Sequence, residues 1–304
     1  MKRTCLLFPC LMMAGSHGAF AQERPNILVL ITDDQTFESI GALNNPQIET
    51  PNLDRLVRQG TTFTHAFNQG SWSGAVSVAS RSMLITGQYA NNACKNDDYL
   101  DPWARIKHQD PATHVPLWGE VFRNAGYTTY ITGKWHNSEV SLLQCFDGGK
   151  YVGEGFNESR GADGQRLQYN RPVDNKDWTP SNAQLGGHWT PKVKDILVKE
   201  GEKSCSAPYI LHQHTSEAYG AAAIEFLQHQ NGEKPFFMYV AFNAPHDPRQ
   251  SPQRFVDKYP VEQMALPPNF LPEHPFNQGD KRVRDERLAP FPRTPEAVRL
   301  HRQE

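Results

Sequence analysis

The apolar stretch NILVLIT at Asn26–Thr32 runs directly into an acidic pair, Asp33 and Asp34. Two further stretches have the same design: YTTYIT precedes GKWH at 127–136, and FFMYVAF precedes NAPH at 236–246. Near-continuous apolar strands are typical of a parallel sheet that is covered on both faces. We therefore predict three buried strands, each followed by polar, reactive side chains.

Helical patterns lie between these strands. Apolar stripes and glycine stops predict helices at 52–59, 117–122 and 215–227. The alternation of strands and helices indicates an α/β fold, a mostly parallel sheet flanked by helices. We expect 137–210 to be a loop-rich active-site insertion. The stretch 266–304 is interpreted as a Pro-rich, charged tail without a strand, which ends in a helix just begun.

In open α/β sheets, ligands bind beyond the carboxyl ends of the strands. The polar residues that follow the three strands should therefore meet at one edge: Asp33 and Asp34, Lys134 and His136, and His246. Adjacent carboxylates repel unless a cation lies between them, and oxygen ligands favour Ca²⁺ or Mg²⁺. The alternative is a turn or helix cap that uses Asp. Lys134 and His136 are two residues apart, which predicts that both lie on one face of a strand.

The stretch SVASRSMLITG at 77–87 is predicted to begin a helix. Ser77 and Arg81 are four residues apart, so they share one helical face, and a helix start favours an anion. A small nucleophile precursor, a guanidinium and an anion-binding helix end together indicate chemistry on an oxyanion ester. The alternative is an ordinary Ser-capped helix with a surface arginine.

The stretch at 77–87 resembles the signature of the type I sulfatases, in which Cys or Ser is followed two residues later by Pro or Ala, then by Arg, an apolar run and Thr-Gly. This family has an alkaline-phosphatase-like α/β fold. GKWH at 133–136 and APHDP at 244–248 resemble further family motifs. The resemblance implies that a serine-type maturase converts Ser77 to formylglycine. It also implies that Asp33, Asp34 and the oxygen at position 77 bind calcium.

The resemblance also implies catalytic roles for the remaining polar residues. Arg81 and calcium would activate a hydroxyl of the hydrated formylglycine made from Ser77. Lys134 would bind the sulfate, His136 would remove a proton from the second hydroxyl, and His246 would protonate the leaving alcohol. The expected activity is sulfuric ester hydrolysis that releases inorganic sulfate, and the expected substrate is a sulfated carbohydrate.

The resemblance runs from about Arg24 to Glu304, but sulfatases continue beyond this point. In the family, a later strand leads to an Asp paired with Asn, His or Gln, and this pair completes the calcium site. Asp280 and Asp285 lie instead in a charged, Pro-flanked stretch without an apolar run before them. We therefore expect 22–304 to be the N-terminal part of a sulfatase catalytic domain, truncated at its C-terminus and incomplete in its fold.

Residues 1–21 are interpreted as a secretory signal peptide, with Lys2 and Arg3 before a short apolar core and AFA at 19–21 as the cleavage site. The core is too short to span a bilayer, so we expect a periplasmic or secreted bacterial protein without stable membrane insertion. A formal charge of −2 over 304 residues gives no sign of nucleic-acid binding.

Five cysteines occur, of which three follow the signal peptide: Cys94, Cys145 and Cys205. Their spacings fit no zinc site, and free, buried thiols are expected.

Two other functions stay open from the sequence. Unmodified Ser77 would suit a phosphoesterase of the same superfamily, in which the serine attacks directly. An inactive glycan-binding fragment would use aromatic side chains of the insertion: Tyr151, Tyr169, Trp178 and Trp189. His188 and His214 are interpreted as ordinary histidines that could line the substrate cleft.

Overall fold

The computed structural model describes residues 24–71, 76–93, 115–155, 181–273, 275–276 and 292–304. Several predictions concern residues outside these ranges: the signal peptide at 1–21, Cys94, Tyr169, Trp178, Asp280 and Asp285. Among the described residues, no helix combines the length and the apolar character needed to cross a membrane.

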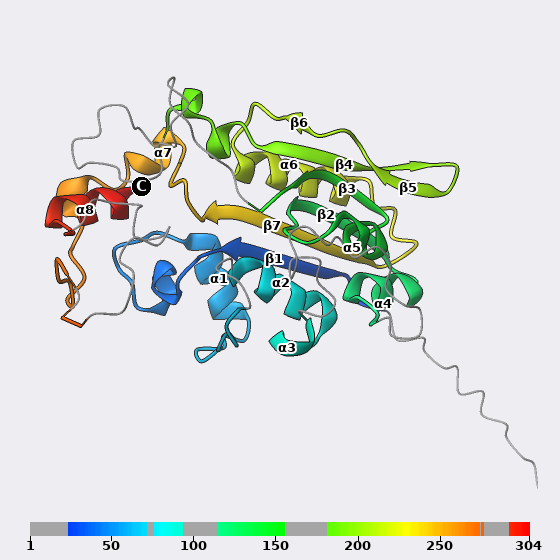
Figure 1. The fold of residues 1–304 in the computed structure, drawn as a ribbon, viewed down its shortest axis with the longest axis horizontal. Helices are drawn as coiled ribbons and strands as arrows, with labels where there is room; N and C mark the ends of the chain where they lie inside the picture. The colour runs from blue at the N-terminus through cyan, green and yellow to red at the C-terminus, as the bar shows by residue number, and fades with distance from the viewer. Residues whose placement is uncertain (1–23, 72–75, 94–114, 156–180, 274, 277–291) are drawn as a thin grey trace, which may run out of the picture.

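A seven-stranded sheet forms the centre of the described chain (Figure 1). The three expected strands lie side by side and parallel, in the order β1 (Ile27–Asp33), β7 (Phe236–Pro245) and β2 (Thr128–Lys134). β3 (Gly148–Gly153) continues the parallel order beside β2. The predicted α/β fold is therefore confirmed, and so are the three apolar strands on which it rests.

The interpretation of 137–210 as a loop-rich insertion is wrong for its described parts. This stretch contributes a helix, α5 (Glu139–Cys145), as well as β3 and the antiparallel strands β4 (Lys192–Lys199), β5 (Glu202–Cys205) and β6 (Tyr209–Ile210). The residue patterns of these strands do not indicate strands in the sequence. β3 is rich in glycine, and β4 mixes charged and apolar residues without a regular period.

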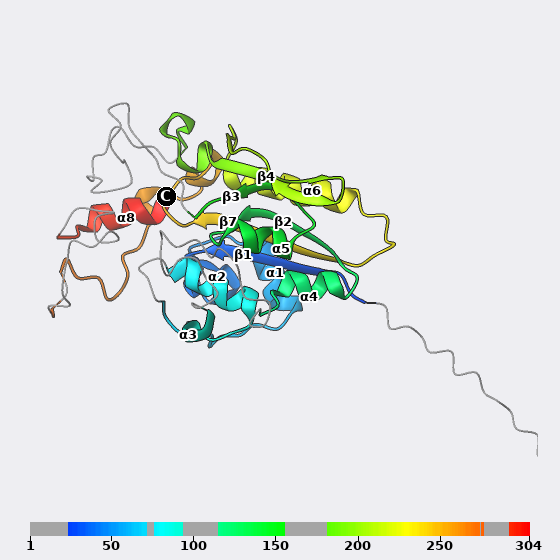
Figure 2. The same ribbon diagram turned by 45° about the vertical axis from the view of Figure 1, so that its right-hand side comes forward.

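The helices form layers on both faces of the sheet. Phe237 and Tyr239 of β7 lie in the main core, with α2 (Val76–Thr86), α4 (Trp118–Asn124) and α5. Met238 and Val240 point to the other face, where α6 (Thr215–Gln228) packs on them. Figure 2 shows α6 on the opposite side of the sheet from α2 and α4. This alternation follows from the period of two along a strand.

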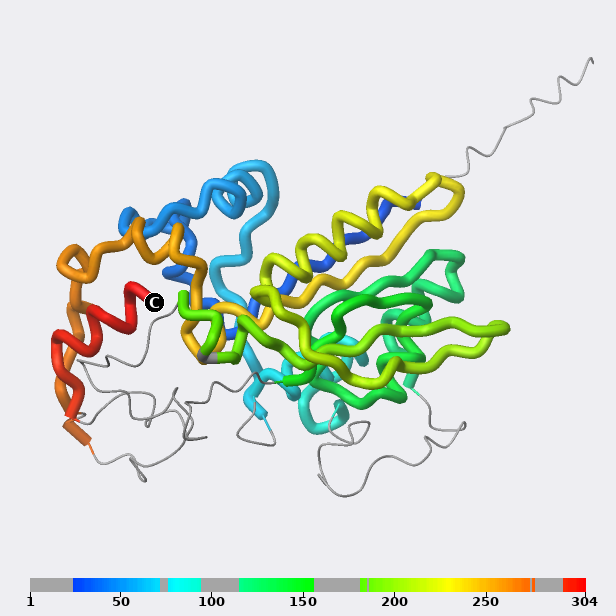
Figure 3. Tube along the Cα trace, turned by 90° about the horizontal axis from the view of Figure 1, so that it is seen from above, coloured from blue at the N-terminus to red at the C-terminus, as the bar shows by residue number. Residues whose placement is uncertain are grey.

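The other predicted helices are also present. The pattern at 52–59 forms α1 (Pro51–Gln59), and the end of the chain forms α8 (Pro295–Gln303), so the helix expected there is confirmed. Two short helices accompany them, α3 (Ala90–Ala93) and α7 (Gln253–Val256). Both α7 and α8 lie beyond the carboxyl ends of β1 and β7 (Figures 1 and 3). They therefore stand at the edge of the sheet where a ligand is expected.

Short 3₁₀ turns fill the connections of the fold. They are η1 (Phe37–Ser39), η2 (Gly41–Leu43), η5 (Ala183–Leu185), η6 (Gly187–Trp189) and η7 (Val261–Gln263). Cys145 is buried and Cys205 half-buried, and both are free thiols, as expected.

The expectation of full burial on both faces is wrong for β1. Its residues alternate, and Leu28 and Leu30 on the α6 face are 48% and 52% exposed. The reason is the course of α6, which packs mainly on β7, β2 and β3. β1 therefore presents an apolar, half-exposed face at one margin of the described sheet.

Candidate active site

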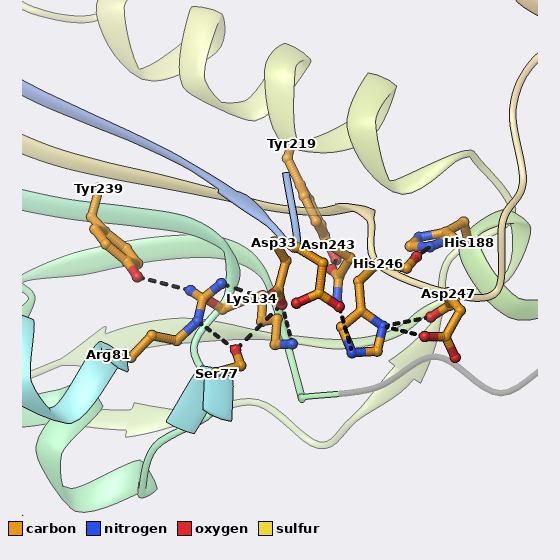
Figure 4. Close-up of polar contacts among 11 residues, drawn as sticks. Asp33, Ser77, Arg81, Lys134, His188, Tyr219, Tyr239, Asn243, His246 and Asp247 are labelled. Carbon is orange, nitrogen blue, oxygen red and sulfur yellow. Dashed lines mark hydrogen bonds and ion pairs between the residues drawn. The ribbon is translucent and has the colours of Figure 1, made fainter. Parts of the chain in front are cut away.

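The carboxyl ends of β1, β2 and β7 bring their polar residues together, as the sequence predicts (Figure 4). Asp33 is the last residue of β1, Lys134 is the last residue of β2, and His246 follows the end of β7. Ser77 is the second residue of α2 and faces this edge. Four segments that are distant in the sequence thus meet at one place.

Asp33 is the centre of the cluster. Its Oδ2 accepts a hydrogen bond from the Lys134 ammonium, lies 3.5 Å from Arg81 Nη2 and accepts a hydrogen bond from Ser77 Oγ at 3.4 Å. The three charged side chains are almost fully buried. Burial raises the pKa of Asp33, but Lys134 and Arg81 outweigh it, so the pKa falls below its ordinary value. Asp33 is therefore a buried carboxylate with two cations beside it.

The guanidinium of Arg81 is held in place by hydrogen bonds that it donates to three partners. Nε donates to Ser77 Oγ at 3.2 Å, while Nη1 donates to the backbone oxygen of Lys134 at 2.9 Å and to the Tyr239 hydroxyl at 2.8 Å. The shared helical face of Ser77 and Arg81 is confirmed, and the alternative of a surface arginine is wrong because Arg81 is 3% exposed. Sequence reasoning missed Tyr239, whose position on an apolar strand gave no sign of a polar partner.

Asp34 has a different partner from Asp33. β1 ends at Asp33, and Asp34 follows it with a positive φ of 63°. Asp34 Oδ2 lies 3.6 Å from His246 Nε2, and His246 Nδ1 lies 2.8 Å from the backbone oxygen of Asp247 and 3.4 Å from its Oδ1. Because a carbonyl oxygen only accepts, Nδ1 carries a proton there and Nε2 faces Asp34.

His136 lies near the cluster, but it comes from a turn after β2 and not from the strand itself. The strand ends at Lys134, and His136 has a positive φ of 61°, so the prediction that Lys134 and His136 share one face of a strand is wrong. The imidazole packs against Gly155, where a Cβ would lie 2.3 Å from the ring. Burial, with the nearby charges of Lys134 and Arg81, lowers the pKa of His136 to about 3. His136 is therefore neutral at ordinary pH.

Oxygen donors for a hard cation are present at this edge. Asp33 Oδ2 and Ser77 Oγ lie 3.4 Å apart, close enough to share an ion, and the Asp34 carboxylate follows directly in the chain. The expected ligand set of Asp33, Asp34 and Ser77 thus fits a calcium ion by its chemistry. The ligand atoms of Asp34, His246 and Asp247 lie within 4.8 Å of one another, so Asp34 also belongs to a second possible metal cluster.

A cavity of about 530 Å³ opens beside His246. Its lining comes from the loops after β1 and β7 and from α8: Thr36, Glu38, His246, Arg249, Tyr259 and Arg302. The residues behind the site were assigned no role from the sequence. Asn243 accepts a hydrogen bond from Tyr219, and His188 and His214 are buried behind His246. His188 also lines the cavity, as expected, although its side chain is only 1% exposed.

The family model described as Sulfatase matches residues 25–288. The chain belongs to the sulfatase family. It is similar to the arylsulfatase of Klebsiella aerogenes, with 28% identity over 82% of the chain and 49% of the relative. It is also similar to N-acetylgalactosamine-6-sulfatase of Rattus norvegicus, with 28% identity over 83% of the chain and 45% of the relative. This sulfatase chain thus spans about half the length of the curated relatives it matches.

Solved structures share the fold of this sulfatase chain. One is a putative sulfatase from Bacteroides fragilis, with a TM-score of 0.51 and 22% identity over 81% of the chain and 50% of that structure. Another was solved in complex with its substrate D-glucosamine-2-N,6-O-disulfate, with a TM-score of 0.51 and 21% identity over 81% of the chain and 40% of that structure. These likenesses confirm the sulfatase-type α/β fold.

Proposed function

We propose that this protein is a sulfuric ester hydrolase that releases inorganic sulfate from a sulfated carbohydrate. The observation that carries the proposal is the fixed guanidinium of Arg81, which holds Ser77 Oγ beside Asp33 and Lys134. A hydroxyl group surrounded by two buried cations suits attack on an anionic ester. A sulfated sugar is favoured because a curated relative is an N-acetylgalactosamine-6-sulfatase and one structural neighbour was solved with a sulfated glucosamine.

Ser77 is proposed as the precursor of formylglycine, made by a serine-type maturase. In its hydrated form this group supplies the hydroxyl that attacks sulfur. Arg81 orients the side chain at position 77 through Nε and stabilises negative charge on its oxygen. Because Tyr239 and the backbone of Lys134 hold the same guanidinium, the orientation is set before the substrate binds.

Asp33, Asp34 and the oxygen at position 77 are proposed to hold the metal ion, with calcium as the ion. When bound, it supplies positive charge that polarises the sulfuryl oxygens. Lys134 adds a second positive charge to the same oxygens. Its position at the end of β2, with a buried stem, keeps the ammonium pointed at the cluster.

The two histidines divide the proton transfers. His246 Nε2 is the atom that faces the site; in the imidazolium form, with Nδ1–H held by Asp247, it gives the Nε2 proton to the leaving alcohol and becomes the neutral ring. His136 is neutral at ordinary pH, so one of its ring nitrogens is not protonated and is proposed to accept the proton that leaves the second hydroxyl at position 77. General acid–base catalysis of this kind contributes about 10²–10⁴-fold to a rate. The apolar leader at 1–21 supports the further proposal that the protein works in the periplasm or outside the cell.

The test is product release by the chain after co-expression with a serine-type maturase. Glucosamine 6-sulfate and glucosamine 6-phosphate are supplied in parallel, and free sulfate and phosphate are measured with and without EDTA. We expect sulfate release that EDTA abolishes. Phosphate release alone would support a phosphoesterase that uses unmodified Ser77. Binding of the sulfated sugar without turnover and without metal dependence would support a glycan-binding protein.

A further inference from the structure

A buried histidine stands directly behind His246. The side chain of His188 comes from η6 and is 1% exposed. Its Nε2 lies 2.9 Å from the backbone oxygen of His246, and its Nδ1 lies 3.0 Å from the hydroxyl of Thr215. Figure 4 shows the ring of His188 beside the backbone of His246, away from the charged centre. His188 therefore contacts the backbone of His246 and not the reacting groups.

The direction of both hydrogen bonds follows from the chemistry of the partners. A carbonyl oxygen only accepts, so Nε2 of His188 carries the proton and donates to His246. Burial lowers the pKa of His188 to about 3, so the ring is neutral and Nδ1 accepts from the Thr215 hydroxyl. The result is a directed chain of two hydrogen bonds, from Thr215 to His188 to His246.

Thr215, where this series of hydrogen bonds begins, is held in place by a helix. It is the first residue of α6 and is fully buried. The helix behind it is anchored in the fold by buried Ala218, Tyr219 and Ala222. Because α6 packs on β7, which also leads to His246, the helix and the strand hold the histidine from two sides.

The same segment is held a second time at Gln250. The backbone N–H of His188 donates to Gln250 Oε1 at 2.7 Å, and His214 Nε2 donates to the backbone oxygen of Gln250 at 3.2 Å. Gly187 permits this approach, since it has a φ of 66° and a Cβ there would lie 2.3 Å from Gln250 Oε1. Hydrogen bonds therefore hold the segment 246–250 at its first and at its last residue.

We propose that His188 is a positioning residue, which together with Thr215 fixes the place of the His246 imidazole relative to Asp34. Its catalytic consequence rests on the proposed function, in which His246 protonates the leaving group. A shift of about 1 Å in a reacting group can cost about 10²-fold in rate. His188→Ala is therefore expected to lower kcat by about that factor and to change KM little.

The experiment compares His188→Ala with four other variants of the full chain. His188→Gln keeps an N–H donor at the reach of Nε2 and is expected to recover most of kcat. Thr215→Val removes only the donor to Nδ1, and Thr215→Ser restores it. The exposed His229 supplies the matched control, His229→Gln, which is expected to keep the original kcat.

Nuclear magnetic resonance of isotope-labelled histidines supplies a readout that does not need activity. We expect a His188 ring protonated at Nε2, and a His246 ring signal that moves in Thr215→Val and returns in Thr215→Ser. A ring protonated at Nδ1 would overturn the proposal, as would an unmoved His246 signal. Equal kcat loss in His188→Gln and His188→Ala would also overturn it. If the original chain releases no sulfate, the proposed function fails, and the ring signals still decide the role of His188.

Discussion

At the scale of single residues, the site depends on one guanidinium with several partners. Arg81 joins Ser77, the backbone of Lys134 and the hydroxyl of Tyr239, and its Nη2 lies beside Asp33. A lysine has one ammonium and cannot reach these directions together. The spacing of Ser77 and Arg81 predicted their shared face, whereas the Tyr239 contact depends on how α2 packs on β7 and could not be predicted from the sequence.

Replacement of this guanidinium tests its positioning role. We expect Arg81→Lys to lower kcat/KM for sulfate release by about 10²-fold, because the side chain at position 77 loses its fixed orientation. Tyr239→Phe is a milder variant of the same cluster, which removes one hydrogen bond to the guanidinium and costs about 1 kcal/mol of unfolding free energy. Arg81→Lys with the kcat/KM of the original chain would contradict the role of Arg81.

The buried histidines predict a loss of stability in acid. The pKa of His188 falls from 6.5 in the unfolded chain to about 3 in the folded one. Between these values the unfolded state binds the extra proton, so the free energy of unfolding falls as the pH falls, by up to about 1.4 kcal/mol per pH unit. Urea unfolding at several pH values should show a shallower dependence in His188→Gln than in His229→Gln. Equal slopes would show that folding does not lower the pKa of His188.

At the scale of the elements, the site depends on how closely β2 and β7 approach. Gly133 precedes Lys134, has a φ of 93°, and a Cβ there would lie 2.0 Å from the backbone oxygen of Ala241. Only glycine fits this position without a shift of β7. The glycine of the GKWH motif therefore allows β2 and β7 to pack closely, and this packing places Lys134 at the site.

A glycine-to-alanine pair tests this close approach. Positive φ alone costs a residue with a side chain about 1–3 kcal/mol, and the clash with Ala241 adds to it, so we expect Gly133→Ala to be strongly destabilised. Gly148→Ala is the control, because its Cβ would meet Tyr130 at an ordinary 3.6 Å. Thermal unfolding measures both variants. Similar midpoints for the two would contradict the proposed steric role of Gly133.

Sequence patterns predicted the elements that are apolar throughout and missed those of mixed pattern. β1, β2 and β7 are predictable because runs of apolar, aromatic and β-branched residues are typical of strands in a parallel sheet, although one face of β1 is half-exposed. β3 and β4 are not, because glycines and scattered charged residues are also typical of loops. The left-handed turns at Asp34 and His136 redirect both side chains, and the residue types there do not reveal them.

At the scale of the whole molecule, the described sheet has an uncovered margin. Within the described ranges β1 pairs with β7 alone, and Leu28 and Leu30 are half-exposed beside it. The matched part of the chain spans 49% and 45% of two curated relatives. Open apolar strands favour association with other chains.

Polar replacement of this face tests its exposure. We expect Leu28→Gln with Leu30→Gln to reduce association at high concentration, measured by light scattering. The free energy of unfolding should change by only about 0.5 kcal/mol for each, since both side chains are half-exposed. Ile31→Gln, on the face that packs against the main core, should instead destabilise the fold. A large loss of stability in the Leu28 and Leu30 variant would show that this face is covered.

The most direct test of the whole account is the mass of the tryptic peptide Gln59–Arg81, after co-expression with a serine-type maturase that converts a reference sulfatase in the same cells. The account predicts a peptide lighter by two hydrogens, with the change located at Ser77 and absent from Ser77→Ala. An unmodified Ser77 beside a fully converted reference would contradict it.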